Sequence, residues 1–93
     1  MKKAYLFLAD GFEEIEGLTV VDILRRAGVD ICTVSIMGKK EITGAHQIEV
    51  KADALYEECR FADGDMFILP GGMPGTRYLG EHQGLCQLLK EKA

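Results

Sequence analysis

The sequence contains no tryptophan, two prolines, two histidines and three cysteines. The two histidines, His46 and His82, show no spacing that would build a metal site, so we predict that the protein binds no metal. Three cysteines without a Cys-x-x-Cys pair do not fit a disulfide framework. They indicate reduced thiols, which are typical of a cytoplasmic protein.

Long apolar runs and an excess of positive charge are also missing. No stretch approaches the ~20 apolar residues needed to cross a bilayer, and the apolar part of Met1 to Ala9 is too short for a secretory signal. The formal net charge of −4 and the pI near 5.1 argue against nucleic acid or an anionic membrane as a partner. A chain of 93 residues with 47% hydrophobic residues fits one globular domain.

The most informative stretch runs from Asp65 to Gly75, Asp-Met-Phe-Ile-Leu-Pro-Gly-Gly-Met-Pro-Gly. Its apolar start predicts a buried strand of a parallel sheet, and Pro74 suits the first turn of a helix. Between them, the uncovered amides of Gly71 and Gly72 could hold an anion or a charge that develops during a reaction. The alternative is a purely architectural turn, which is common between strands and helices. The stretch is neither Gly-x-Gly-x-x-Gly nor a P-loop, so we expect no nucleotide cofactor.

Strand and helix patterns alternate along the chain. Strands are predicted at Lys3–Ala9, Asp30–Ile36 and 65–69. Helices are predicted at Glu13–Ala27, where Gly28 ends the helix, and at Glu81–Lys92. A hairpin is predicted with arms Lys40–Thr43 and Gln47–Lys51, and a loop with one helical turn at Asp53–Ala62. The right-handed crossover rule then predicts an α/β fold, a parallel sheet sandwiched by helices. Only three core strands are predicted and the chain ends on a helix, so we expect an unfinished sheet.

The first helix carries a carboxylate on its predicted core face. Val20, Ile23, Leu24 and Ala27 form one apolar stripe, and Glu16 falls on the same stripe. Burial there would raise the pKa of Glu16 and let a protonated carboxyl group donate a hydrogen bond. Alternatively, Glu16 reaches solvent from the first turn. A second apolar set, Ile15, Leu18 and Val21, covers another part of the fold or forms a dimer face.

No nucleophile can be paired with a base in this sequence. Cys32 lies inside a strand, Cys59 lies in an acidic loop that disfavours its thiolate, and Cys86 lies within the last helix without an evident base. His46 in the hairpin and His82 at a helix start are predicted to be solvated surface residues. We therefore predict that all three cysteines are structural or incidental.

Three motifs together resemble a known family. Ala9-Asp-Gly-Phe-Glu-Glu-Ile-Glu16, Asp22-Ile-Leu-Arg-Arg-Ala-Gly28 and Leu69-Pro-Gly-Gly72 closely resemble the amino-terminal half of the ThiJ/PfpI family, in the same order over essentially all 93 residues. That family belongs to the class I glutamine-amidotransferase-like superfamily and includes a parkinsonism-associated protein deglycase. The resemblance implies a flavodoxin-like fold for residues 1–93, as the amino-terminal part of one domain, and a homodimer formed through the first helix (Ile15, Leu18).

The resemblance also implies a site. Glu16 would be a protonated glutamate that contacts a reactive cysteine, and Gly71 and Gly72 would supply oxyanion amides without any cofactor. The family's nucleophilic cysteine follows a strand beyond the helix that matches Glu81–Lys92, so we expect it to be missing here and the chain alone to be inactive. The implied substrates are small reactive carbonyls or their adducts, handled by glyoxalase, deglycase or amidohydrolase chemistry. A non-enzymatic stress sensor or chaperone, or a flavodoxin-like binding module, are the alternatives.

Overall fold

The computed structural model describes residues 3–92. Its elements follow the order β1 (Lys3–Leu8), α1 (Glu14–Arg26), β2 (Asp30–Ser35), β3 (Glu41–Thr43), β4 (Glu49–Lys51), β5 (Ala54–Leu55), the 3-10 helix η1 (Tyr56–Glu58), β6 (Met66–Ile68), α2 (Gly75–Glu81) and α3 (Gln83–Lys92). The alternation of strands and helices that the sequence predicted is confirmed.

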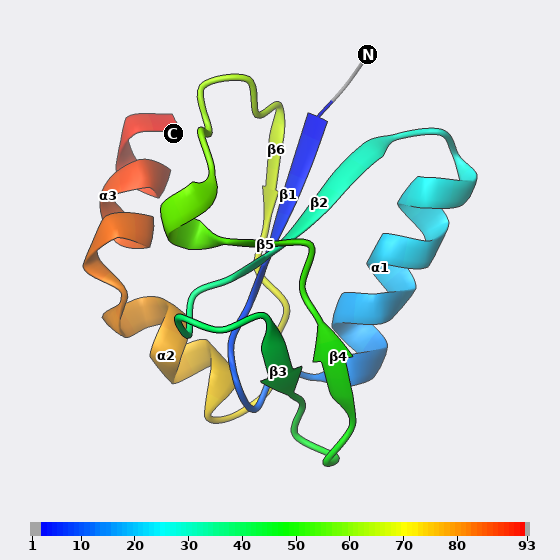
Figure 1. Cartoon of the computed structure of the whole chain (residues 1–93). Coiled ribbons are helices and arrows are strands. Elements are labelled where there is room, and N and C mark those ends of the chain that lie inside the picture. Colours follow the sequence, from blue (N-terminus) through cyan, green and yellow to red (C-terminus); the bar gives the residue numbers. More distant parts are fainter. Residues whose placement is uncertain (1–2, 93) are drawn as a thin grey trace.

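The main sheet is parallel throughout, in the order β5-β2-β1-β6. Helix α1 covers one face of this sheet, and α2 and α3 cover the other (Figure 1). Strands β3 and β4 form a separate antiparallel hairpin at one end of the sheet. The predicted α/β sandwich with a hairpin insertion is therefore confirmed.

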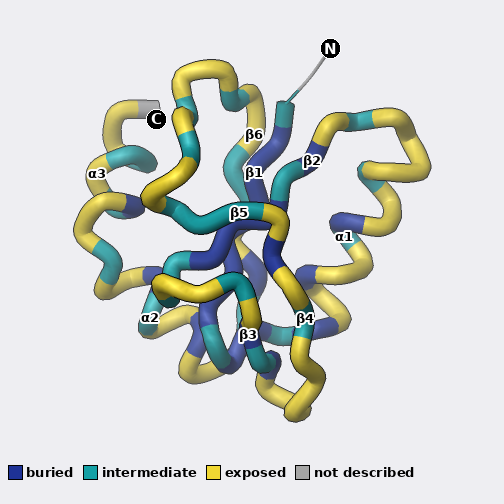
Figure 2. The backbone as a smooth tube through the Cα atoms, viewed as in Figure 1, coloured by how far each residue is buried: buried dark blue, intermediate teal, exposed yellow. Residues whose placement is uncertain are grey.

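Strand β1 lies at the centre of the core and is buried on both faces (Figure 2). Because side chains alternate along a strand, its residues divide between two hydrophobic clusters. Ala4, Leu6 and Leu8 pack with Phe12 and Val21 beneath α1, whereas Tyr5, Phe7 and Ala9 pack with Val34, Leu79 and Leu85 beneath α2 and α3. This division explains why the apolar run of β1 is continuous rather than alternating.

The predicted core face of α1 is confirmed in part. Val20 and Leu24 pack against the core beneath the helix. Ile23 is 57% exposed and Ala27 and Glu16 are exposed, because the helix is rotated so that its buried residues are Glu14, Gly17 and Val21. Gly17 decides this rotation, because a Cβ there would lie 3.0 Å from the Phe12 ring. The absence of a side chain lets Phe12 pack directly against the helix.

The second apolar set of α1 divides between core and surface. Val21 faces the sheet, while Ile15 is 74% exposed and Leu18 is 37% exposed. The two exposed side chains leave an apolar patch on the outer surface of α1.

Two connections also differ from prediction. The loop expected at Asp53–Ala62 contains the fourth strand of the sheet, β5, because Ala54 pairs with Val34 of β2. The final helix is preceded by a separate helix, α2, which ends where His82 takes an extended backbone conformation. The prediction of three core strands is thus wrong by one short strand.

Within residues 3–92, no helix has both the length and the apolar composition that a membrane span requires. The expected cytoplasmic location stays a prediction.

Candidate functional site

The carboxyl ends of β1 and β6 bring two loops together at one edge of the sheet. The Glu13 N–H donates to the Gly71 carbonyl oxygen at 2.8 Å, which joins the start of α1 to the loop after β6. Gly72 has φ of +101°, and a Cβ on it would lie 2.7 Å from the Gly11 oxygen. Only glycine fits this position, because the two backbones touch and φ is positive.

The structure brings together two of the predicted site residues, Glu16 and Gly71. The Gly71 N–H donates to Glu16 Oε1 at 2.9 Å, and a Cβ on Gly71 would lie 2.6 Å from the same oxygen. The Glu16 side chain is exposed, so of the two readings of Glu16 the structure agrees with the one that reaches solvent from the first turn, and not with burial on the core face. Its position beside the glycine turn follows from its place in the first turn of α1.

Gly72 lies next to this contact, and its carbonyl oxygen accepts from the Thr76 N–H at 2.8 Å, in the turn that leads into α2. The roles of Gly71 and Gly72 as oxyanion donors stay predictions. In this structure the Gly71 N–H donates its hydrogen bond to the Glu16 carboxylate.

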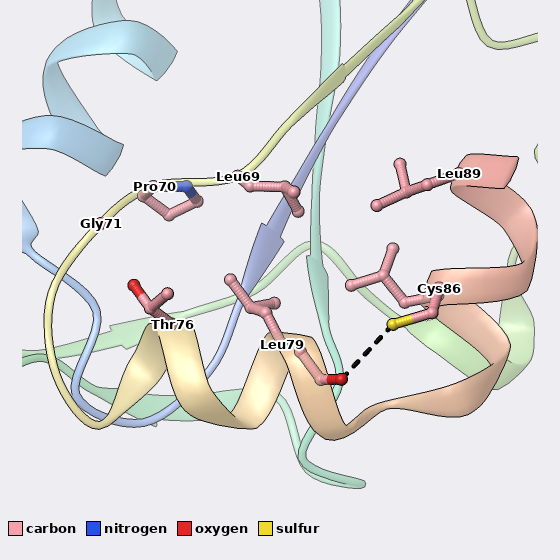
Figure 3. A pocket seen from close by; sticks show the side chains of 9 residues that line it. Leu69, Pro70, Gly71, Thr76, Leu79, Cys86 and Leu89 are labelled. Atoms are coloured by element: carbon pink, nitrogen blue, oxygen red, sulfur yellow. Dashed lines mark hydrogen bonds between the residues drawn. The ribbon is translucent and has the colours of Figure 1, made fainter. Parts of the chain in front are cut away.

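A hollow of about 370 Å³ lies between the loop after β6, α2 and α3 (Figure 3). Gly71, which contacts Glu16, is part of its wall. Its wall is mostly apolar and is formed by Leu69, Pro70, Gly71, Thr76, Leu79, Gly80, Leu85, Cys86 and Leu89. Cys86 lines this hollow, which the sequence did not indicate. Its Sγ donates to the Gly80 carbonyl oxygen at 3.4 Å, so its partner is a backbone acceptor and not a base.

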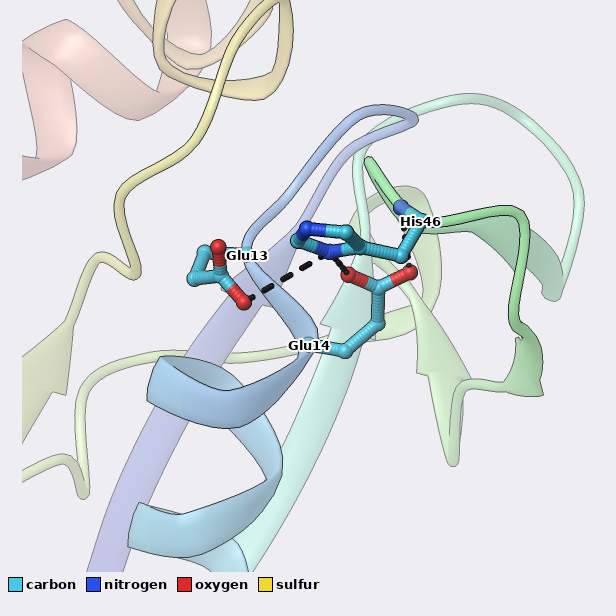
Figure 4. Close-up of side chains that lie close together, drawn as sticks. All are labelled: Glu13, Glu14 and His46. Carbon is cyan, nitrogen blue, oxygen red and sulfur yellow. Dashed lines mark hydrogen bonds and ion pairs between the residues drawn. The ribbon is translucent and has the colours of Figure 1, made fainter.

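The buried carboxylate of α1 is Glu14, which the sequence did not indicate. His46 Nδ1 lies 2.7 Å from Glu14 Oε1, and the His46 N–H donates to Oε2 at 2.7 Å (Figure 4). The Ile48 N–H donates to Oε2 at 3.3 Å. Burial raises the pKa of Glu14, but these hydrogen bonds outweigh burial and lower it to about 2. Glu14 thus anchors the tip of the hairpin to the start of α1.

His46 is exposed, as predicted, but its ring is held by Glu14 and is not free in solvent. The hydrogen bond to Glu14, followed by the negative charge of Glu13, raises the pKa of His46. Ligand atoms of Glu13, Glu14 and His46 lie within 4.8 Å of one another, a spacing that could hold a metal ion. Because the Glu14 oxygens already accept hydrogen bonds from the hairpin, the cluster is explained by its structural role.

His82 is a capping residue and not the solvated residue that was predicted. Its Nδ1 accepts the Leu85 N–H at 2.9 Å, and its ring centroid lies 4.5 Å from that of Tyr56. The N–H accepted by the ring belongs to the first turn of α3, where helices leave such donors unsatisfied. This role could not be recognised until the start of α3 was known.

The other two cysteines have weakly acidic thiols. Burial raises the pKa of Cys32 to about 11. Burial, followed by the charge of Glu58, also raises the pKa of Cys59, in spite of an opposing hydrogen bond from Cys32. The expectation that neither is a reactive nucleophile agrees with this chemistry.

Comparison with known proteins identifies the family. The sequence profile described as the DJ-1/PfpI family matches residues 2–93. The chain belongs to the DJ-1/PfpI family. It is 30% identical over 92 residues to the Parkinson disease protein 7 homolog of Danio rerio, covering 98% of this chain and 49% of that protein. The protein dj-1beta of Drosophila melanogaster is 29% identical over 91 residues, with the same coverage. The predicted ThiJ/PfpI resemblance is confirmed.

Solved DJ-1 structures show the same fold. Oxidized DJ-1 of Toxoplasma gondii superposes with a TM-score of 0.93 at 31% identity, covering 98% of this chain and 50% of that one. The cysteine-to-alanine mutant of a DJ-1 superfamily protein from Salmonella typhimurium superposes with a TM-score of 0.92 at 33% identity. The match covers 98% of this chain and 49% of that one. The flavodoxin-like architecture is therefore confirmed. The chain spans about half the length of these relatives.

Proposed function

We propose that this DJ-1/PfpI chain forms one half of the active site of a cysteine-dependent hydrolase or lyase. The substrates would be small reactive carbonyl compounds or their adducts. The supporting observation is the 2.9 Å contact between Glu16 Oε1 and the Gly71 N–H, beside an apolar hollow of about 370 Å³. This contact joins the acidic motif of α1 to the Pro-Gly-Gly turn at the carboxyl edge of a parallel sheet, where α/β proteins place their ligands.

The proposed reaction begins with a thiolate from a cysteine outside residues 1–93. Its sulfur attacks the carbonyl carbon, a C–S bond forms, and the electrons of the C=O double bond move to oxygen. The Gly72 N–H, together with the Gly71 N–H when Glu16 turns away from it, would stabilise that oxyanion. Glu16 would then contact the attacking cysteine and set the pKa of its thiol.

The first measurement is the intact mass of the protein from its natural source. A mass well above 10.3 kDa is expected, since the proposed nucleophile lies outside this chain. Turnover of a small 2-oxoaldehyde by that protein is then compared with its Glu16→Gln variant, in which we expect at least about a 100-fold loss. Glu49→Gln, which removes an exposed carboxylate on β4, is the matched control and should retain full activity.

Two results would overturn the proposal. Glu16→Gln with unchanged turnover and an unchanged thiol pKa would remove the role of Glu16. Absence of turnover in the unmodified protein, together with stable oxidation of its cysteine by peroxide, would favour the stress-sensor alternative. Turnover by residues 1–93 alone would show that the nucleophile lies within this chain, contrary to the proposal.

The exposed apolar patch of α1 supports a homodimer as the form of the protein. Ile15 and Leu18 protrude from the helix at 74% and 37% exposure. Exposed apolar patches of this kind are common at protein interfaces, and a two-fold contact would bury the patch against its own copy.

A further inference from the structure

A second hollow, of about 340 Å³, lies at the carboxyl end of β1, between the hairpin and the start of α2. Its wall is formed by three segments of the chain: Asp10 and Gly11, residues 43–45 with Gln47, and residues 73–74 with Tyr78. It has no lining residue in common with the hollow of the proposed active site. The carboxyl ends of parallel strands are where α/β proteins bind ligands, in sites of about 300–1,000 Å³.

The segments that form this hollow are fixed to one another. The Gly11 N–H donates to the Thr43 carbonyl oxygen at 2.8 Å, and the Ala45 N–H donates to the Phe12 carbonyl oxygen at 2.8 Å. On the other side Pro74 packs directly on Gly11, where a Cβ would lie 2.6 Å from the Pro74 nitrogen. The shape of the hollow is therefore set by the fold, and a ligand would enter a site that is already formed.

The residues that line this hollow carry polar groups without a partner in residues 3–92. One Asp10 carboxylate oxygen accepts the Thr43 N–H at 3.0 Å, whereas the other accepts no hydrogen bond. The hydroxyl groups of Thr43 and Tyr78 and the side-chain amide of Gln47 also form no hydrogen bond within the described chain. Gln47 carries this amide at φ of 66°, a conformation in which glycine would be less strained.

The charge of the lining favours a cation. Asp10 is the only charged residue among those that form the wall. The neighbouring cation, Arg77, lies over the Tyr78 ring at 5.3 Å from its centroid, and its charge is offset by Glu81 at 4.0 Å. A carboxylate oxygen without a partner therefore lies among neutral oxygen acceptors.

An ammonium group matches this arrangement, because it combines one positive charge with three N–H donors. Met73 and Pro74 add apolar surface at the same wall, and Met73 is 67% exposed. We propose that this hollow binds a small primary amine, whose ammonium group pairs with Asp10 and whose short carbon chain lies on Met73 and Pro74.

The test titrates n-butylamine at pH 7 into the protein expressed at its natural length and labelled at its methionine methyl groups. The methyl signal of Met73, identified by its loss in Met73→Leu, is followed by NMR. We expect the signal to shift and saturate, with n-butanol binding at least about tenfold more weakly, because a hydrogen bond to a charged group is lost. Butyrate should cause no shift. Met37 and Met66 lie outside the hollow, so their signals are internal controls.

Two asparagine variants form a matched pair. Asp10→Asn keeps an acceptor for the Thr43 N–H but removes the charge, and should weaken n-butylamine binding at least about tenfold. Asp65→Asn makes the same change at a carboxylate that accepts the Lys3 N–H at 2.9 Å, at the other end of the sheet. This variant should bind the amine as tightly as the unmodified protein.

Three results would overturn the proposal: a Met73 signal that stays unshifted throughout the titration, n-butanol binding as tightly as n-butylamine, or equal affinities of Asp10→Asn and Asp65→Asn for the amine. The comparison of the three ligands needs no variant, so it decides the question even if Asp10→Asn fails to fold. All of these readouts measure binding and not turnover, so the result is independent of the proposed enzyme function.

Discussion

Replacing Gly72 by alanine should destabilise the protein more than replacing a positive-φ glycine that lies in open space. Gly72 has φ of +101°, and a Cβ there would meet the Gly11 oxygen at 2.7 Å and also the Glu13 nitrogen. The backbone conformation alone costs an alanine about 1–3 kcal/mol. Separating the two loops also weakens the hydrogen bond from Glu13 to Gly71, worth about 1 kcal/mol. We expect a total loss of about 3 kcal/mol.

Alanine variants of two other glycines separate the cost of the backbone conformation from the cost of the close contact between the loops. Gly28 has φ of +81°, and a Cβ added there would have no atom within 4 Å, so Gly28→Ala should cost about 1–2 kcal/mol from backbone conformation alone. Gly80 lies in α2, also with open space, so Gly80→Ala should add about 1 kcal/mol through helix propensity. Each kcal/mol shifts the melting temperature of a domain of this size by about 4–8 °C.

Thermal and urea unfolding of the three variants would test this order. Gly72→Ala should have the lowest melting temperature, Gly28→Ala an intermediate one, and Gly80→Ala a value above that of the unmodified protein. If Gly72→Ala were no less stable than Gly28→Ala, the close approach of the two loops would have no energetic consequence.

Three further predictions concern other parts of the molecule. The pKa of Glu14 is lowered from 4.5 to about 2 in the folded protein, so Glu14 should contribute stability above pH 4.5 that is lost as the pH falls towards 2. In the Glu14→Gln variant the melting temperature should depend less on pH over this range. The His46 contribution has the opposite sign: it is present below pH 6.5 and lost as the pH rises through the raised folded pKa, so His46→Gln should remove a decline in melting temperature above pH 6.5. Ile15→Asp should weaken self-association in analytical ultracentrifugation, whereas Ile48→Asp, at an equally apolar exposed position on the hairpin, should not; equal effects of both would contradict a dimer through α1.

The fold was largely predictable because its signals are local. The apolar run of β1, the charged ends and closing glycine of α1, and the Pro-Gly-Gly turn after β6 each carry their pattern within one short segment. Strand β5 was missed because two residues are too few for a recognisable period. Its existence depends on the neighbouring strand β2.

The site was predictable only in part. The family resemblance implied that Glu16 and Gly71 belong to one site, and the structure places them in contact. The rotation of α1 was not predictable, because the helix has apolar residues on two faces and the choice depends on Phe12 packing against Gly17. The anchoring role of Glu14 depends on hairpin N–H groups more than 30 residues away, which no local pattern reveals.

The central position of β1 has a consequence for the synthesis of the protein. β1 is synthesised before the other strands of this sheet, yet its pairing with β6 has to wait for about 60 further residues. At about 5–20 residues per second, this delay is about 3–12 s. During that time one edge of a strongly apolar segment has no neighbour in the nascent chain. We therefore expect chaperones that bind nascent chains to act on β1. Slower translation between β1 and β6 should increase aggregation.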